Sequence, residues 1–266
     1  MATDFISQLR LDGRGMVVLG AGQGIGAATA HALSQAGARV LCVDKEAELA
    51  ERIAKEVGGV ACVADVTRRE DMVRIFATAR ESVGPVRGIV DIVGMAKLGP
   101  MSSFTDADYD WQFDVVLRHA FLALQIGGPL IAQSGGGTIT FVGSISGEAC
   151  LPNEVVYGAS KAALHYLARA AALELGPQGV RVNVISPGFT RTPRLNKMLS
   201  EERWAAIGEG IPLGRAATPD EIAGPLLFLS SELSAHVNGM VLAIDGGLGA
   251  MAAIPAAFAA TLKEKK

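Results

Sequence analysis

The stretch Met16-Val-Val-Leu-Gly-Ala-Gly-Gln-Gly-Ile-Gly26 decides the fold, because it joins a short apolar run to a cluster of glycines. The run 16–19 has no polar alternation, which is typical of a strand buried on both faces of a parallel sheet. Glycines allow a tight turn and a close approach of the backbone to a ligand. A helix that begins near Ile25 would add free N–H groups and the positive end of its dipole, which favour phosphate. The stretch therefore predicts a strand, a phosphate-binding turn and a helix in succession.

The same alternation of short apolar runs and helical patterns continues along the chain. Further buried strands are predicted at residues 40–43, 60–63, 88–93, 138–142, 181–185 and 240–244. Alanine-rich stretches predict helices at residues 25–36, 47–57 and 69–83, and another helix is expected to begin near Pro219. This pattern indicates an α/β fold, a doubly wound seven-stranded parallel sheet with helices on both faces. No linker or repeat divides the chain, so residues 1–266 are expected to form a single domain, with 189–213 as a lid.

Composition excludes several classes of function. The chain has 266 residues, a net charge of −3 and no basic patch that would indicate nucleic acid. Its three cysteines, Cys42, Cys62 and Cys150, are far apart and show no zinc spacing, which predicts free thiols in a reducing compartment. We see no signal peptide and no uncharged apolar stretch long enough to span a bilayer. A cytoplasmic protein with no nucleic-acid, membrane or metal partner is expected.

Tyr157, Lys161 and Ser144 carry the most information about function. Residues four apart share one face of a helix, so the Lys161 ammonium can lie near the Tyr157 phenol. A free phenol has a pKa of about 10, and a neighbouring positive charge lowers it. Such a tyrosine could move a proton on or off an alcohol or carbonyl oxygen, and Ser144 could hydrogen-bond the same oxygen. The alternative is that both residues of the helical pair are ordinary surface or packing residues.

Two aspartates follow the next predicted strands. Asp44 ends the second strand, where a carboxylate can accept hydrogen bonds from ribose hydroxyls and repel a 2′-phosphate; the alternative is a helix N-cap. Lys45 leaves some use of NADP open, but NAD is the expected cofactor. Asp65 follows the third strand and could bind an adenine amino group or cap the helix near Arg69.

With these residues in order, the chain resembles the classical short-chain dehydrogenase/reductase family over about residues 11–247, and this resemblance implies a Rossmann-like fold. The matching motifs are Gly20, Gly24 and Gly26; Asp65-Val66; Ser144, Tyr157 and Lys161; Pro187-Gly188; Thr192; and Asp245-Gly246-Gly247.

The resemblance implies an NAD-dependent oxidoreductase that transfers a hydride between a nicotinamide and a secondary alcohol or ketone. It implies Ser144, Tyr157 and Lys161 as catalytic residues, and Met95, Cys150 and Asn153 as substrate contacts together with Ser144 and Tyr157. The cofactor would contact Gly20, Gln23, Gly24, Ile25, Gly26, Asp44, Asp65, Val66, Val93, Gly94, Tyr157, Lys161, Pro187, Gly188, Thr190 and Thr192. A homotetramer is expected, formed through the long helices and the C-terminal end; the tail 248–266 could instead cover a neighbour's cleft.

The chain also departs from the family pattern. The family's Asn-Asn-Ala-Gly is Asp91-Ile-Val-Gly94 here, and the fourth catalytic residue, an asparagine, falls on Val116. His119 could substitute in the proton relay, or it is a surface or packing histidine. These departures keep a catalytically weak dinucleotide-binding scaffold open as an alternative.

Apolar residues of the lid predict an apolar, cyclic or long-chain substrate, or they are simply packed together. They are Leu195, Met198, Leu199, Trp204, Ile207 and Ile211. A second enzymatic alternative is an NADPH-dependent reductase of 3-oxoacyl thioesters, with Arg118, Arg191 and Arg194 as a basic entrance.

Overall fold

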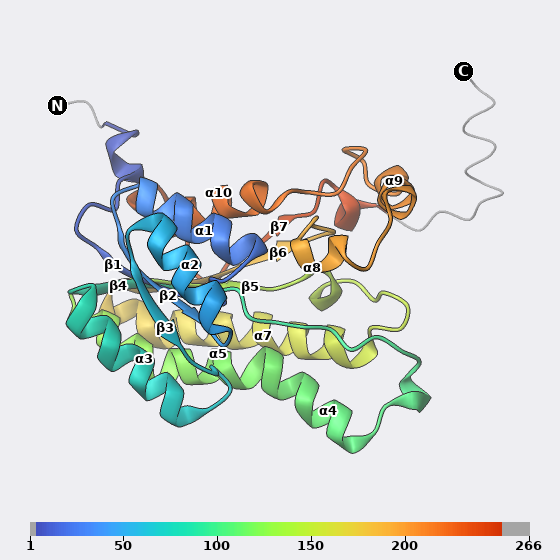
Figure 1. The fold of residues 1–266 in the computed structure, drawn as a ribbon, viewed down its shortest axis with the longest axis horizontal. Helices are drawn as coiled ribbons and strands as arrows, with labels where there is room; N and C mark the ends of the chain where they lie inside the picture. The colour runs from blue at the N-terminus through green and yellow to red at the C-terminus, as the bar shows by residue number, and fades with distance from the viewer. Residues whose placement is uncertain (1–3, 252–266) are drawn as a thin grey trace.

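The protein, described from a computed structural model over residues 4–251, contains a seven-stranded parallel sheet between two layers of helices (Figure 1). The strand order is β3-β2-β1-β4-β5-β6-β7, and every neighbouring pair is parallel. The strands are β1 Gly15–Leu19, β2 Arg39–Asp44, β3 Val60–Val63, β4 Val86–Asp91, β5 Gly137–Val142, β6 Val180–Pro187 and β7 Val241–Ile244. The doubly wound fold expected from the sequence is confirmed.

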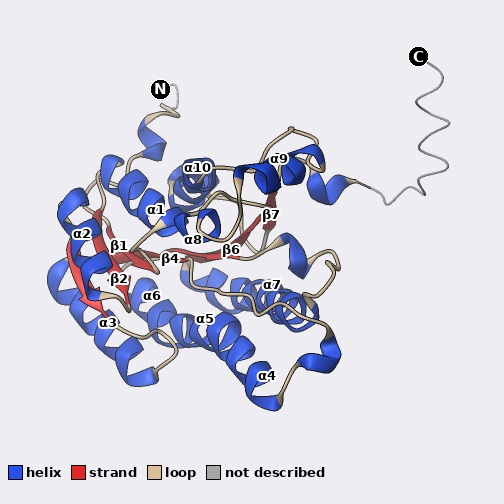
Figure 2. Ribbon diagram, turned by 45° about the vertical axis from the view of Figure 1, so that its right-hand side comes forward, coloured by secondary structure: helices blue, strands red, loops and turns tan. Residues whose placement is uncertain are grey.

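Helices cover both faces of this sheet (Figure 2). They are α1 Gly24–Gln35, α2 Ala47–Val57, α3 Arg69–Ser82, α4 Asp106–Phe113, α5 His119–Leu122, α6 Gly128–Gln133, α7 Val155–Leu175, α8 Pro193–Asn196, α9 Glu201–Glu209 and α10 Pro219–Ser230. Buried residues of α1, α2 and α10 form one core with the sheet, and those of α3, α5, α6 and α7 form the other. Because all strands are parallel, their carboxyl ends lie at one edge of the sheet, where the connecting loops meet.

The strand predictions were right in position and less accurate in extent and burial. β4 ends at Asp91 rather than at residue 93, so Ile92 and Val93 already belong to the following loop. β7 is only partly buried along its length, and β3 has one buried residue in four, although both were expected to be fully buried. The reason is their position: they are the two outermost strands, and each has a neighbour on one side only.

α4, α5 and α6 belong to one continuous helix, Asp106–Gln133, that contains two π-helical turns, Asp114–Arg118 and Ala123–Gly127. By length and composition this helix could cross a membrane, with a window of mean hydropathy 1.5, whereas the sequence predicted no such stretch. That prediction considered only uncharged stretches, and this helix contains Arg118. Half of the apolar window is buried inside the protein, which is typical of a core helix.

The lid region contains two short helices, α8 and α9, which lie beyond β6 at the same end of the molecule as β7 (Figure 1). The helix expected near Pro219 is confirmed as α10, where Thr218 and Glu221 form a capping box and Pro219 occupies the first turn. Of the expected tail, residues 252–266 lie outside the described residues. Cys42 and Cys62 are buried and Cys150 is exposed, all as free thiols.

Candidate active site

Ser144, Tyr157 and Lys161 are brought together where β5 meets α7. Ser144 follows β5 by two residues and caps the 3₁₀ turn Ile145–Gly147, and its side chain is close enough to Tyr157 to affect the pKa of that phenol. Lys161 is fully buried, and its Nζ donates to the carbonyl oxygen of Val142, the last residue of β5, at 2.7 Å. The same Nζ lies 5.8 Å from the centre of the Tyr157 ring. The shared helix face predicted from the four-residue spacing therefore exists.

Electrostatics in this corner differ from the prediction. Burial raises the pKa of Tyr157 to about 12, the neighbouring hydroxyl of Ser144 lowers it, and the charge of Glu154 raises it further. The expected lowering of this pKa by Lys161 is not found, because removing the phenolate from water outweighs the favourable contacts. Burial also lowers the pKa of Lys161 to about 8, against the opposing charge of Asp91. The ammonium is therefore weakened by the same burial that places it beside the phenol.

Sequence reasoning missed two polar groups behind Ser144. The Ser144 hydroxyl donates to Ser146 Oγ at 3.1 Å, and Ser146 donates to the Glu154 carboxylate at 2.5 Å. This chain of hydrogen bonds fixes the rotamer of Ser144 and brings a negative charge close to Tyr157. The only sequence signal for Glu154 was its place between Ser144 and Tyr157, three residues before the tyrosine.

The turn between β1 and α1 fits a dinucleotide on steric grounds. A Cβ on Gly26 would lie 1.9 Å from the carbonyl oxygen of Gly20, so only glycine allows the helix to start this close to the strand. Gly20 and Gly24 have φ of 82° and 57°, in the left-handed region. α1 begins at Gly24 without a side-chain cap, so its first N–H groups can bind an anion.

Asp44 is placed against this turn. Its Oδ2 accepts the N–H of Gly22 at 2.9 Å, and its Oδ1 accepts the N–H of Glu46 at 3.1 Å. Glu46, and not Asp44, is the N-cap of α2, so the capping alternative is wrong. Each carboxylate oxygen has a second lone pair, which leaves Asp44 able to accept ribose hydroxyls. Arg52, which donates to the Gly22 carbonyl oxygen, is a nearby cation that sequence reasoning missed.

Three close approaches connect the glycine turn to the catalytic corner. A Cβ on Gly20 would lie 3.1 Å from Val93, and one on Gly24 would lie 3.3 Å from Thr192. A Cβ on Gly94 would lie 3.0 Å from the Nζ of Lys161. The segments expected to line the cofactor site are therefore gathered around one edge of the sheet.

The remaining expected cofactor residues lie on the same edge. Asp65 accepts hydrogen bonds from the N–H and hydroxyl of Thr67, and Arg68 caps α3 without a side-chain bond, so Asp65 is not the cap of that helix. Pro187 ends β6, and the Gly188 N–H donates to Ile244. Thr192 caps α8 through its Oγ1, which leaves its hydroxyl proton free for a ligand. Gln23 and Val66 lie in the turns after β1 and β3, Ile25 lies in the first turn of α1, and Thr190 forms a parallel bridge with Ala217.

The expected substrate residues are placed unequally. Met95 is partly buried and contacts the guanidinium of Arg194 from the lid. Cys150 and Asn153 are exposed, and Asn153 has a left-handed φ of 64° while its carbonyl oxygen accepts the N–H of Gly99. Gln112, which sequence reasoning missed, is buried and holds the loop after β4 by bonds to Met95 and Lys97.

Five of the six apolar lid residues pack on one another rather than toward the catalytic corner. Trp204 and Ile211 are the centre of a small separate core, against which Leu195, Leu199 and Ile207 pack, whereas Met198 is exposed.

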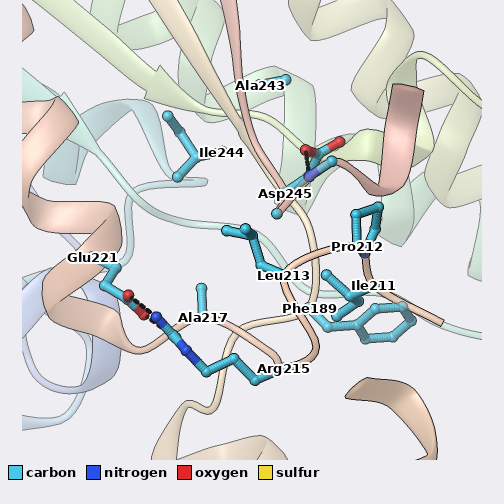
Figure 3. Close-up of a pocket in the computed structure, with 12 residues that line it drawn as sticks. Phe189, Ile211, Pro212, Leu213, Arg215, Ala217, Glu221, Ala243, Ile244 and Asp245 are labelled. Carbon is cyan, nitrogen blue, oxygen red and sulfur yellow. Dashed lines mark hydrogen bonds and ion pairs between the residues drawn. The ribbon is translucent and has the colours of Figure 1, made fainter. Parts of the chain in front are cut away.

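Beside this core lies a cavity of about 510 Å³, lined by Phe189, Leu213 and the end of β7 (Figure 3). Ser144, Tyr157 and Lys161 do not line it. The Arg215–Glu221 ion pair lies at one side of it (Figure 3).

Comparisons with known proteins find relatives over nearly the whole chain. Residues 20–249 match a family described as enoyl-(acyl carrier protein) reductase. A galactitol 2-dehydrogenase (L-tagatose-forming) of Cereibacter sphaeroides is 37% identical over 92% of this chain and 98% of its own. A D-threitol dehydrogenase of Mycolicibacterium smegmatis is 36% identical, over 93% and 96%. The solved structure of a 7α-hydroxysteroid dehydrogenase with NADH and 7-oxo glycochenodeoxycholic acid is 31% identical, with a TM-score of 0.88 over 92% and 98%.

The chain belongs to the short-chain dehydrogenase/reductase family. It is an oxidoreductase that acts on CH–OH groups of small molecules with NAD(P).

Proposed function

We propose that this protein is an NAD-dependent dehydrogenase/reductase of secondary alcohols and ketones in which Tyr157 exchanges the proton of the substrate oxygen. One observation carries the proposal: the hydroxyls of Ser144 and Tyr157 lie together beside a buried Lys161, next to the glycine turn.

The roles of the three residues follow from their chemistry. When bound, the nicotinamide supplies or takes up the hydride. In alcohol oxidation Tyr157 accepts the hydroxyl proton as a phenolate, and in ketone reduction its phenol returns that proton to the oxygen. Ser144 hydrogen-bonds the same oxygen and so holds it within reach of Tyr157. The positive charge of Lys161 favours the phenolate.

The direction of the reaction depends on pH. With a pKa of about 12, Tyr157 holds its proton at neutral pH, which is the form needed to protonate a ketone oxygen. The phenolate needed for oxidation increases as pH rises toward that value. Reduction should therefore be favoured at neutral pH, and the rate of oxidation should increase in alkaline solution.

NAD is the proposed cofactor because of Asp44. Its carboxylate is fixed by two backbone N–H groups, and it faces the place where a 2′-phosphate would bring a second negative charge. Lys45 and Arg52 are cations in the same region, so NADP should be bound more weakly rather than excluded.

The proposed substrate is apolar or cyclic. Large apolar side chains are exposed on the two segments that flank the site, Leu98 and Met101 after β4 and Phe189, Met198 and Leu213 in the lid. The steroid ligand of the 7α-hydroxysteroid dehydrogenase supports the same class. Polyols are the second candidate, because galactitol and threitol dehydrogenases are similar over nearly the whole chain.

Two further alternatives are weaker. The description of the matching family supports a thioester reductase that acts on an acyl carrier protein. Of the three arginines expected at its entrance, Arg191 is paired with Glu201 and Arg118 lies 3.8 Å from Asp114. Arg194, which contacts Met95, is the one of the three with no carboxylate partner within residues 4–251. A scaffold without turnover is favoured by Val116 and Ile92 only, and the catalytic corner opposes it.

A cytoplasmic homotetramer is proposed for the assembled protein. Tyr166 and Leu173 on the outer face of α7 are 73% and 80% exposed, and β7 is an uncovered edge strand. Light scattering at micromolar concentration should give the mass of four chains; a monomer would refute this proposal.

A screen of alcohols and ketones with both NAD(H) and NADP(H) tests the function. We expect turnover of cyclic or hydrophobic secondary alcohols with NAD, measured as absorbance of NADH. Good oxidation of polyols alone would move the assignment to the second substrate class. The absence of turnover with every substrate, despite NADH binding, would favour the scaffold.

A further inference from the structure

Three ionisable side chains from three elements meet in the buried layer beneath the active site. Asp91 ends β4, His119 begins α5 and Lys161 lies on α7, and their exposed fractions are 1%, 0% and 2%. Asp91 Oδ1 is 3.2 Å from His119 Nε2. The charge of Asp91 also acts on Lys161, where it opposes the effect of burial on the pKa of that lysine. His119 is therefore not the surface residue that the sequence allowed.

The carboxylate of Asp91 has few hydrogen bonds for a buried anion. Its Oδ1 accepts the N–H of Val93 at 3.1 Å, whereas its Oδ2 has no partner within residues 4–251. His119 approaches Oδ1 without the alignment of a hydrogen bond, and neither of its ring nitrogens has a partner in the same range. A buried charge with so little compensation is costly unless a cation lies close by. The interior must therefore supply positive charge to Asp91.

Lys161 has the complementary need. Its Nζ makes one hydrogen bond, to Val142, although an ammonium has three donors. The other ionisable groups around it are Tyr157 and His165 on α7, and the charge of Lys161 acts unfavourably on a protonated His165. Glu148 and Glu154 act on His165 and Tyr157. Asp91 pairs with Phe141 on β5, one residue before Val142, whose carbonyl oxygen accepts the hydrogen bond from Lys161 Nζ. Asp91 is thus the carboxylate on the neighbouring strand, and its charge acts on Lys161.

We propose that Asp91, packed against His119, is the built-in counter-ion of Lys161 and extends to higher pH the range in which this lysine is an ammonium. Asp91 is a positioning residue: it acts on the phenol only through the lysine. Its effect on catalysis rests on the proposed function, whereas the pairing of charges does not.

The direction of the pH shift on removing Asp91 distinguishes an effect through Lys161 from a direct effect of Asp91 on Tyr157. If Asp91 acted directly on Tyr157, removing its negative charge would favour the phenolate and move alcohol oxidation to lower pH. If it acts through Lys161, its removal makes the ammonium lose its proton more easily, and the phenolate loses its support. Oxidation then moves to higher pH.

The test is Asp91→Asn, which keeps the size of the side chain and removes its charge. In protein labelled with ¹³C-lysine, the ε-carbon of Lys161, assigned with Lys161→Met, reports the ionisation without any turnover. We expect its midpoint to fall from about 8 in the wild type by roughly one unit, a typical effect of losing a close opposite charge. The rise of kcat/KM for alcohol oxidation should move to higher pH in the same variant.

Asp114→Asn is the matched control, because it removes one carboxylate from an exposed position of the same long helix that carries His119. It should leave both measurements unchanged. If Asp91→Asn alone does not fold, the double variant Asp91→Asn/His119→Asn removes the same charge and leaves two amides that can bond each other.

An unchanged Lys161 midpoint in the folded variant, or oxidation that moves to lower pH, would overturn the counter-ion proposal. A wild type that turns over no alcohol or ketone would refute the proposed function alone, because the lysine titration would still decide the pairing.

Discussion

The turn between β1 and α1 and the corner between β5 and α7 lie at the same edge of the sheet, but different forces hold them. In the turn, backbone atoms approach so closely that a Cβ on Gly26 would overlap the oxygen of Gly20. In the corner, Lys161 is buried and Tyr157 is partly buried, and their pKa values depend on that burial and on the charges of Glu154 and Asp91. The structure of the turn is therefore determined by steric contacts. The properties of the corner are determined by charges, which the protein interior screens weakly.

This difference predicts how each region responds to substitution. Changes in the turn should weaken cofactor binding or the fold, with little effect on the pH dependence of the rate. Changes in the corner should leave cofactor binding intact and alter the rate or its pH dependence.

Tyr157→Phe should have the largest effect. Loss of the hydroxyl removes the group that moves the proton, and we expect kcat to fall by about 10²–10⁴-fold, the usual range for general acid–base catalysis. NADH affinity, measured by fluorescence, should be nearly unchanged. Tyr166→Phe is the same change at an exposed position of the same helix and should be silent. Activity close to the wild type in Tyr157→Phe would remove this residue from the mechanism.

Gly26→Ala should have the second largest effect, and its cause is steric. Its methyl group would overlap the Gly20 oxygen, and we expect a destabilisation of about 1–3 kcal/mol or more, together with weaker NADH binding. Gly224→Ala, in α10 with no atom near its Cβ position, should be neutral or stabilising by about 0.4–1 kcal/mol. Thermal unfolding measures both, and equal melting temperatures for the two variants would contradict the steric account.

Asp44→Ala should change cofactor preference by about 10-fold or more toward NADP, because hydrogen bonds to a charged group contribute about 1.5–3 kcal/mol. Dissociation constants of NADH and NADPH give the ratio. Glu46→Ala removes a neighbouring exposed carboxylate and should leave the ratio unchanged. An unaltered ratio in Asp44→Ala would refute its contact with the ribose.

Glu154→Gln should have the smallest effect, and its direction is the informative part. The charge of Glu154 raises the pKa of Tyr157, so its removal lowers that pKa and moves the rise of alcohol oxidation to lower pH. The amide oxygen can still accept the bond from Ser146. Glu148→Gln, an exposed change in the same loop, serves as the control. Asp91→Asn is expected to move the same pH profile in the opposite direction, so the two variants together test whether each carboxylate acts as proposed.

The sequence predicted the fold and the turn well because both depend on local patterns. The apolar residues of runs such as 16–19 and 138–142 predict strands. The glycine spacing indicates backbone positions that only glycine can occupy without strain. The neighbours of Ser144, Tyr157 and Lys161 were harder to predict. Ser146 and Glu154 act through contacts that no periodicity records, and the raised pKa of Tyr157 follows from burial, which only the folded chain defines.

The partial exposure of β7 and β3 was missed for a related reason. The sequence of a strand alone does not show whether that strand lies at the edge or in the middle of a sheet. His119 was named from the sequence as a relay, surface or packing residue, but its contact with Asp91 could not be predicted because of helix geometry. A regular α-helix places residues about 100° apart around its axis, and a π-helical turn contains one residue more than an α-helical turn.

The two π-helical turns of the helix 106–133 have a consequence for its evolution and for engineering. Compared with a regular α-helix of the same sequence, each extra residue changes the direction of the side chains that follow it by about 100° around the helix axis. The facing of His119 toward β4 thus depends on the length of the segment before it as much as on its own identity. Deleting one residue between 114 and 118 would let this turn close as an ordinary α-helical turn, so that the second half of the helix could keep the same side chains toward the sheet.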